Sequence, residues 1–170
     1  MKRKIDYLDS MEVEGLGDLT ETLVAVNRSA AVVKGGRRFS FSALSVVGNR
    51  SGTVGYGFGK ARQVPMAIEK AAKDGRKHLQ RVPLTKGGSI PHEVTGRFCG
   101  SNIRMLPASP GTGIIACSSV RAVCEGAGVT NILTKSYGST NPINLVKATL
   151  DALAQLRTRE KVAELRGVEL

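Results

Sequence analysis

A glycine-rich turn with three cations carries the clearest chemistry in this sequence. In Lys34-Gly35-Gly36-Arg37-Arg38, a lysine and two arginines flank a pair of glycines. Glycine lets a backbone come close to a phosphate, and an arginine can hold a phosphate through two parallel hydrogen bonds. A charged turn is also often simply solvated. The turn is therefore a candidate phosphate-binding site, provided that further cations fold beside it.

A segment with glycine at every second position follows closely. Gly55, Gly57 and Gly59 share one face of the expected strand, and Lys60 and Arg62 come directly after it. A strand face without side chains loses packing and costs backbone entropy, so another group must approach it closely. Two explanations stay open at this point. The face is covered by a packed helix, or it admits the backbone of a nucleic acid held by the two cations.

Two nucleotide-binding loops are excluded by their spacing. A Walker loop needs a glycine that is separated by four intervening residues from its Gly-Lys pair, and a Ser or Thr after the lysine. Around Gly59-Lys60 these positions are Val54 and Ala61. A dinucleotide-binding fingerprint starting at Gly55 also fails, because Lys60 stands where its third glycine belongs.

The loop Pro107–Gly113 offers an enzymatic alternative. Glycines at the start of a helix form an anion site, and with Ser118 and Ser119 the segment faintly resembles the phosphate loop of GHMP-type small-molecule kinases. Such an enzyme also needs a magnesium ligand and a catalytic base. From residue 91 onward there are only six acidic residues, and no nearby pair stands out for that work. We therefore expect no catalytic residue and no enzyme.

Metal binding is not expected either. Cys99, Cys117 and Cys124 lack the Cys-x-x-Cys spacing, and His78 and His92 lie in different segments. Zinc needs three or four converging nitrogen or sulfur ligands. We expect reduced thiols that serve as small apolar residues, with no metal and no cofactor.

Positive charge is concentrated in the centre of the chain. The 170 residues carry a formal net charge of +11 and a pI near 10.0. Residues 19–90 hold thirteen Lys and Arg against three Asp and Glu, whereas residues 1–18 hold three against five. Such a balance indicates nucleic acid, an acidic membrane surface or an acidic protein as partner, and the asymmetry favours nucleic acid. No run approaches the ~18 apolar residues of a membrane span, and acidic residues soon follow Met1–Lys4, so we expect a cytoplasmic protein without a membrane partner.

Periodicity predicts two small α+β units in series. The first has three strands, including one from Phe39 to Val47 and, after a hairpin turn, a return strand from Thr53 to Gly59. It also has a basic helix from Val64 to about Leu79 and a possible short helix near residues 15–22. The second has strands at 93–98, 102–106 and 132–133, a helix at about 114–126, and a helix that begins at Asn141-Pro142. The expected division is a flexible acidic tail at 1–18, a first domain at 19–82, a linker at 83–90, a second domain at 91–158 and a C-terminal extension at 159–170.

Five blocks of the sequence resemble the family of the fifth protein of the bacterial small ribosomal subunit. They stand in the family's order and cover roughly residues 19–155. In this chain the blocks are Lys34–Leu44, Val54–Arg62, Ile90–Val94, Pro107–Gly113 and Tyr137–Asn144. Four positions depart from the family's usual pattern: Cys117 and Ser118 stand where two glycines are usual, Gly126 takes a position more often apolar, and Leu106 replaces a residue that is commonly polar.

The resemblance implies a fold and a function. The fold would be a domain like a double-stranded-RNA-binding module, followed by a two-layer α/β domain of the type shared with GHMP kinases. The protein would be a structural constituent of the small subunit that binds 16S rRNA and stabilises the head relative to the body. It would contact small-subunit proteins four and eight, line the messenger RNA entry with protein three, and contribute with proteins four and twelve to translational accuracy.

The resemblance also implies roles for single residues. The RNA-binding set would be Arg28, Lys34, Gly35, Gly36, Arg37, Arg38, Lys60 and Arg62. The surface facing protein four would include Gly113 and Arg121.

Overall fold

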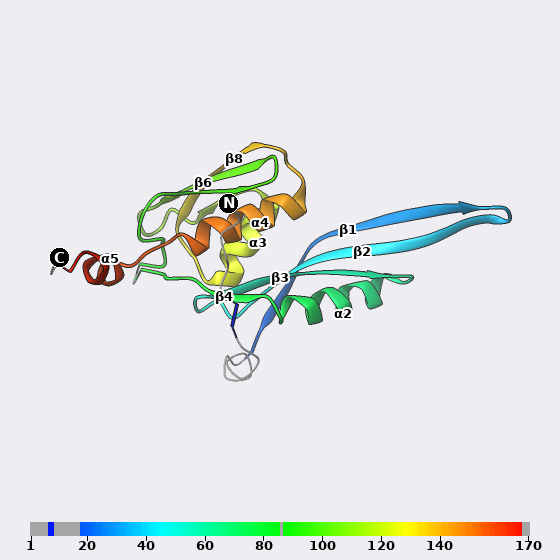
Figure 1. Cartoon of the computed structure of the whole chain (residues 1–170), viewed down its shortest axis with the longest axis horizontal. Helices are drawn as coiled ribbons and strands as arrows, with labels where there is room; N and C mark the ends of the chain where they lie inside the picture. The colour runs from blue at the N-terminus through cyan, green and yellow to red at the C-terminus, as the bar shows by residue number, and fades with distance from the viewer. Residues whose placement is uncertain (1–6, 9–17, 86, 168–170) are drawn as a thin grey trace.

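A long two-stranded hairpin projects from one end of the protein (Figure 1). The computed structural model describes residues 7–8, 18–85 and 87–167. Strand β1 (Thr20–Val33) pairs with β2 (Gly36–Gly48) in antiparallel register from Thr20↔Gly48 to Val33↔Gly36. We call its outer part, residues 26–41, the arm. The predicted turn is shorter than expected, since Arg37 and Arg38 already belong to β2 and only Lys34 and Gly35 form the bend.

The prediction of a short helix near residues 15–22 is wrong for the residues of this range that the structure describes. Residues 20–22 open β1 and pair with the end of β2. Of the predicted flexible tail only three residues are described, and the backbone N–H of Leu8 donates to the carbonyl oxygen of Leu79 at 2.9 Å. The rest of both predictions lies outside the described residues.

Helix α2 (Val64–Gly75) packs on the glycine face of β3 (Thr53–Ala61). A methyl group added at Gly57 would collide with the carbonyl oxygen of Ala71, and one added at Gly59 would collide with that of Ala67. Both alanines are fully buried, at 0% exposure. The packed helix is therefore the correct explanation of the alternating glycines, because no space for a nucleic acid remains on that face.

The basic helix ends earlier than its spacing predicts. Helix α2 stops at Gly75, and Leu79 starts β4 (Leu79–Arg81), which pairs with β3. The first sheet thus has the order β1-β2-β3-β4. Leu79 is apolar because it is buried in the sheet, with 0% exposure, and not because it continues the helical stripe.

The second sheet is mixed and has helices on one face. Its order is β5 (Val94–Phe98), β6 (Ser101–Pro107), β8 (Ile132–Gly138) and β7 (Ile114–Ile115), with β7 parallel to β8 and the other pairs antiparallel. Two helices, α3 (Ser118–Ala127) and α4 (Pro142–Ala154), cover its inner face. The helix predicted from residue 114 starts only at Ser118, because residues 114–115 pair with β8, and the strand predicted at 132–133 runs on to Gly138.

The start of α4 is confirmed. The side-chain oxygen of Asn141 accepts a hydrogen bond from the backbone N–H of Ile143 at 3.2 Å, and Pro142 occupies the first helical turn. This is the capping arrangement that the dipeptide Asn-Pro predicts. A last helix, α5 (Arg159–Arg166), has no buried residue and lies at the end of the molecule (Figure 1).

One hydrophobic core runs under both sheets. It joins Leu44 and Val46 of β2 to Val123 of α3 and Leu153 of α4. The buried side chains form a single cluster that spans the predicted domain limits at residues 82 and 91. The division into two domains therefore stays a prediction.

The turn between β2 and β3 closes the C-terminal end of α3. The backbone N–H of Arg50 donates to the carbonyl oxygen of Gly126 at 3.0 Å, and that of Gly52 donates to Ala127 at 2.8 Å. A methyl group on Gly48 would collide with the backbone of Gly126. A methyl group on Gly126 itself would lie 3.3 Å from the side chains of Val46 and Val54, so a larger residue at position 126 would fit only tightly against the first sheet.

The three cysteines differ in environment. Cys124 is fully buried in α3, whereas Cys99 and Cys117 are exposed. The interpretation of the thiols as small packing residues therefore fits Cys124 alone. Burial raises the pKa of the Cys124 thiol to about 12, so almost none of it is the reactive thiolate at neutral pH.

We expect iodoacetamide at pH 8 to modify Cys99 and Cys117 in the native protein and to leave Cys124 untouched. The buried thiol is both inaccessible and protonated, because its pKa lies far above the pH of the reaction. Intact-mass and peptide mass spectrometry check this, with all three sites reacting in denaturant as the control. Rapid modification of Cys124 in the folded protein would contradict the packing of α3.

Candidate nucleic-acid interface

The arm carries four of the predicted cations and no acidic residue. Between Leu23 and Val47 the chain contains no Asp or Glu. Cross-strand pairing places Arg28 opposite Phe41 and Arg37 opposite Val32, so both arginines lie on the face that α2 covers further along the sheet. Arg38 lies on the other face. The arm therefore offers positive charge on both faces, with no acidic group on the arm to neutralise it.

The two glycines of the bend lie in open space. A methyl group added at Gly35 or Gly36 would meet no atom within 4 Å, and Gly36 has a φ of +144° that favours glycine. Nothing in the described protein covers this backbone. Together with Lys34 at the bend, the tip thus permits the close approach of a phosphate chain.

An exposed aromatic ring lies among the arm cations and was not predicted from the sequence. The guanidinium carbon of Arg28 lies 5.0 Å from the centroid of the Phe39 ring, and Phe39 is 43% exposed. Phe41, two residues on, instead packs against the buried alanines under α2. The signal in the sequence is Phe39 itself, the first phenylalanine of the alternating strand, which lies on the same face as Phe41 but further out along the arm.

Lys60 and Arg62 lie at the base of the arm. With residues of β2 and α2 they line an open hollow of about 530 Å³. The Lys60 ammonium also lies 5.7 Å from the centroid of the Phe58 ring, which is 36% exposed. The residues that line the hollow are Ser40, Lys60, Ala61, Arg62, Gln63, Met66 and Lys70. The sequence does not predict that Lys70 lies near Lys60, because this depends on how α2 packs.

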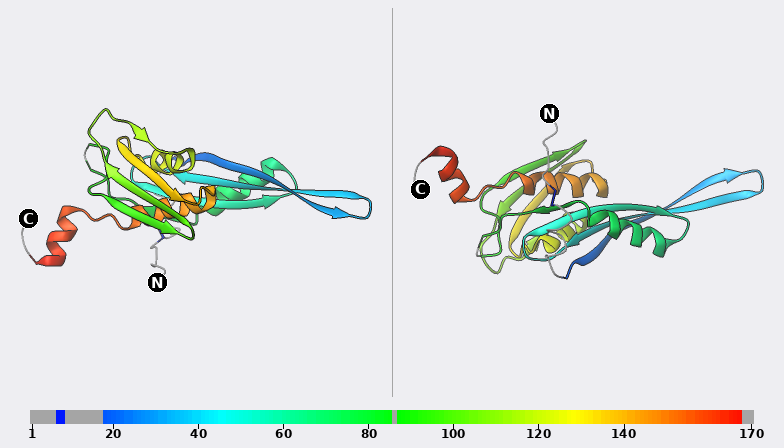
Figure 2. Two further views of the ribbon diagram at one scale, coloured as in Figure 1. Left: turned by 90° about the horizontal axis from the view of Figure 1, so that it is seen from above. Right: turned by 60° about the horizontal axis from the view of Figure 1, so that its bottom comes forward.

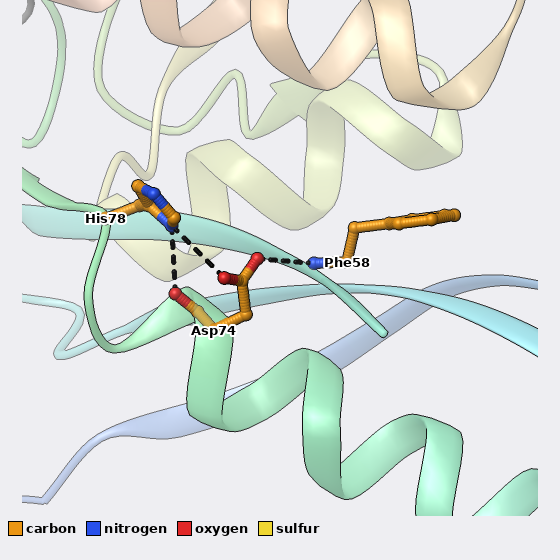
Figure 3. A network of polar contacts seen from close by, with 3 residues as sticks. All are labelled: Phe58, Asp74 and His78. Carbon is orange, nitrogen blue, oxygen red and sulfur yellow. Dashed lines mark hydrogen bonds and ion pairs between the residues drawn. The ribbon is translucent and has the colours of Figure 1, made fainter. Parts of the chain in front are cut away.

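A polar network fixes α2 against the edge of β3 (Figure 3). The backbone N–H of Phe58 donates to the Asp74 carboxylate at 3.0 Å, and His78 Nδ1 lies 3.0 Å from the Asp74 carbonyl oxygen and 3.8 Å from its carboxylate. Arg76 pairs with Glu21 of β1 at 3.0 Å. The network satisfies an exposed N–H at the sheet edge and holds the helix that carries Lys70 in a fixed position.

The two residues predicted to face a protein partner lie near a second hollow. Gly113, with φ +76°, donates its N–H to the side-chain oxygen of Asn131 at 3.1 Å. Arg121 lines an open hollow of about 500 Å³ that Ile114 also lines. Arg50, from the turn between β2 and β3, lines the same hollow and was not predicted from the sequence, because the other lining residues come from β7, α3 and the loop after α3.

Residues 7–8, 18–85 and 87–167 contain no helix that is long and apolar enough to cross a membrane. Within the same residues, no group of three or more His, Cys, Asp or Glu side chains is placed to hold a metal ion.

Comparison with known proteins covers nearly the whole chain. Residues 19–83 match the family model of the ribosomal protein S5 N-terminal domain, and residues 96–166 match that of the ribosomal protein S5 C-terminal domain. A protein of Rhodopirellula baltica named small ribosomal subunit protein uS5 is 56% identical over 158 residues, 92% of this chain and 89% of its own length. Proteins of the same name are 56% identical in Psychromonas ingrahamii, over 91% of this chain and 92% of the relative, and 53% identical in Shewanella oneidensis, over 94% and 95%.

Proposed function

Because this chain belongs to the ribosomal protein S5 family, we propose that it holds 16S rRNA through the arm and the hollow beside Lys60 and Arg62. It is a structural constituent of the small ribosomal subunit and not an enzyme. The observation that carries the proposal is the arm, which presents four cations and an open glycine backbone with no acidic residue beside them. In this proposal the protein binds RNA by neutralising the charge of its phosphates.

The expected RNA-binding residues form two groups in this proposal. Arg28, Lys34, Arg37 and Arg38 contact phosphates along the arm, and Gly35 and Gly36 let the RNA backbone approach its tip. Lys60 and Arg62 contact a neighbouring stretch at the base. Phosphate contacts carry affinity and little sequence information, so selectivity comes from the shape of the folded RNA.

The finer ribosomal role is also part of the proposal. The protein fixes the head relative to the body, contacts proteins four and eight, lines the messenger RNA entry with protein three, and contributes with proteins four and twelve to accuracy. Gly113 and Arg121 belong to the surface facing protein four, and the hollow beside Arg121 supports this with a recess that a side chain of a partner can enter. The protein acts in the cytoplasm, where ribosomes translate.

We further propose a finer fold assignment. The first unit is like a double-stranded-RNA-binding domain, which is supported by an antiparallel sheet with one helix on a single face. The second is a two-layer α/β domain of the GHMP-kinase type, which is supported by its mixed sheet with two helices on one face. The loop at Pro107–Gly113 would then be shared architecture and not a remnant of kinase chemistry.

We expect RNA binding to depend steeply on salt. If the six predicted cations each neutralise one phosphate, affinity should fall roughly 10³-fold between about 50 and 200 mM monovalent salt. Filter binding of the full chain to small-subunit rRNA over this range measures the slope. A flat response would show that phosphate neutralisation is not the basis of binding.

Sedimentation tests the proposal in the cell. A tagged full-length chain should migrate with the small-subunit peak of a sucrose gradient at low magnesium and leave it only at high salt. A free double-stranded-RNA-binding regulator would stay at the top of the gradient. A small-molecule kinase would also stay there and would bind ATP in a direct binding assay.

A further inference from the structure

The outer face of the second sheet is open. Helix α4 lies so close to the inner face that a methyl group on Gly96 would collide with the carbonyl oxygen of Ala148. Burial alternates along β5, β6 and β8, so every second residue lies on the side away from the core. No described helix or strand covers this face (Figure 2, left). This is an unpartnered surface that the arm and its hollow do not use.

Strand register aligns the outward side chains in rows across this face. One row is Arg97–Asn102–Tyr137, and the next is Thr95–Arg104–Lys135. A third, aliphatic row at the far end joins Leu106, Leu133 and Ile115. We call the first two rows the sheet platform.

The sheet platform is basic. Arg97, Arg104 and Lys135 supply three cations, and the acidic residue beside them is Glu93, which pairs with Arg104 at 2.6 Å. Within the described residues, no ion pair is found for Arg97 or Lys135. The carboxylate of Asp151 accepts the backbone N–H of Arg97 from the side of α4, and the same carboxylate also accepts a hydrogen bond from Gln155. Two cations therefore remain available to an anionic partner.

The sheet platform also has a free aromatic ring. Tyr137 is 52% exposed and lies in the same row as the amide of Asn102 and the guanidinium of Arg97. An exposed ring on a sheet stacks an unpaired base, an amide hydrogen-bonds base edges, and neighbouring cations hold the phosphates. An acidic protein would pair with the cations, but it would not account for the exposed ring and the amide that lie in the same row.

We propose that the sheet platform binds a single-stranded or looped segment of RNA, with a base stacked on Tyr137 and phosphates on Arg97 and Lys135. This rests on the proposed function and extends it, because the platform lies on the second sheet and the arm on the first. One chain thereby joins two separate RNA segments.

The test uses small-subunit particles that lack this protein, to which full-length variants are added. Reversing both charges with Arg97→Glu and Lys135→Glu should weaken binding at least tenfold and lower the salt slope by about 1.4, as expected for two phosphates of a single strand. Tyr137→Ala should weaken binding roughly tenfold while leaving the salt slope unchanged, because stacking releases no counterions. Hydroxyl-radical footprinting should show loss of one protected rRNA segment, with the arm's protection retained.

Two further variants separate the possible outcomes. Arg159→Glu with Lys161→Glu on α5 makes the same change of charge away from the sheet platform and should leave footprint and slope unaltered. Lys34→Glu with Arg37→Glu in the arm should remove a different protected segment. If the arm variant loses its footprint while both platform variants bind like the wild type, the platform proposal is overturned and the proposed function stands.

The remaining outcomes are also decisive. If neither arm nor platform variants alter any RNA protection, the proposed function fails together with this extension. If the platform variants keep every RNA protection but the particle loses a neighbouring protein, the platform binds protein and the proposal is overturned. Circular dichroism and thermal unfolding should match the wild type for all variants, since every changed side chain is exposed.

Discussion

Lys34→Glu combined with Arg37→Glu is expected to lower affinity for small-subunit rRNA at least about 100-fold. Each reversal removes a charge-assisted contact worth about 1.5–3 kcal/mol and places a negative charge near phosphates. The salt slope should also fall by about two, one for each lost phosphate contact. The fold should be unaffected, because the arm lies beyond the hydrophobic core and residues 28–38 are all exposed. Titration of full-length protein into labelled rRNA at several salt concentrations measures both quantities.

A charge-conserving pair supplies the control. Lys34→Arg with Arg37→Lys keeps both positive charges, so its salt slope should equal that of the wild type and its affinity should change only a few-fold. Wild-type binding by the double glutamate variant would remove the arm from the RNA-binding surface. An equal loss in the charge-conserving pair would show that geometry, and not charge, governs the contact.

Gly57→Ala should destabilise the protein by at least about 3 kcal/mol. Its methyl group would collide with the carbonyl oxygen of Ala71 and approach the backbone of Gly75, so α2 would have to move away from the sheet. Forcing extra atoms into a packed interface costs typically about 1–3 kcal/mol and sometimes more, and here the obstacle is backbone that cannot rotate aside. Urea unfolding followed by circular dichroism measures the loss, which is a large part of the ~5–15 kcal/mol of an ordinary domain.

Gly35→Ala is the matched control for this effect. It makes the same chemical change at the bend of the arm, where a methyl group meets no atom within 4 Å. Its free energy of unfolding should stay within about 0.5 kcal/mol of the wild type. A loss below about 1 kcal/mol for Gly57→Ala would mean that α2 does not press on β3 as closely as described.

The elements that the sequence predicts well are those whose signals are local. Strand β2 follows from the alternation after Phe39, and the start of α4 follows from the cap at Asn141. The strand β7 was missed because two residues carry no periodicity and its partner, β8, comes later in the chain. The end of α2 was missed because Leu79 is buried by a neighbouring strand, and a single apolar residue does not show which element buries it.

The candidate site divides in the same way. The cations at Lys34–Arg38 and at Lys60 and Arg62 stand out from the local sequence, and five sequence blocks carry the family resemblance, which the comparisons confirm. The place of Phe39 beside Arg28, and of Lys70 beside Lys60, depends on strand register and helix packing, which the sequence does not reveal. The open outer face of the second sheet was equally hidden. Its strands were predicted, but the side on which the helices lie is decided by packing.

The closure of α3 by the turn between β2 and β3 has a mechanical consequence. Main-chain hydrogen bonds from Arg50 and Gly52 join the turn of the first sheet to the end of α3, beside a core that both sheets share, and side-chain rotation cannot loosen such bonds. We therefore expect the first sheet and α3 to move as one body. Under the proposed function, a displacement of rRNA at the arm would then shift the second sheet together with the first.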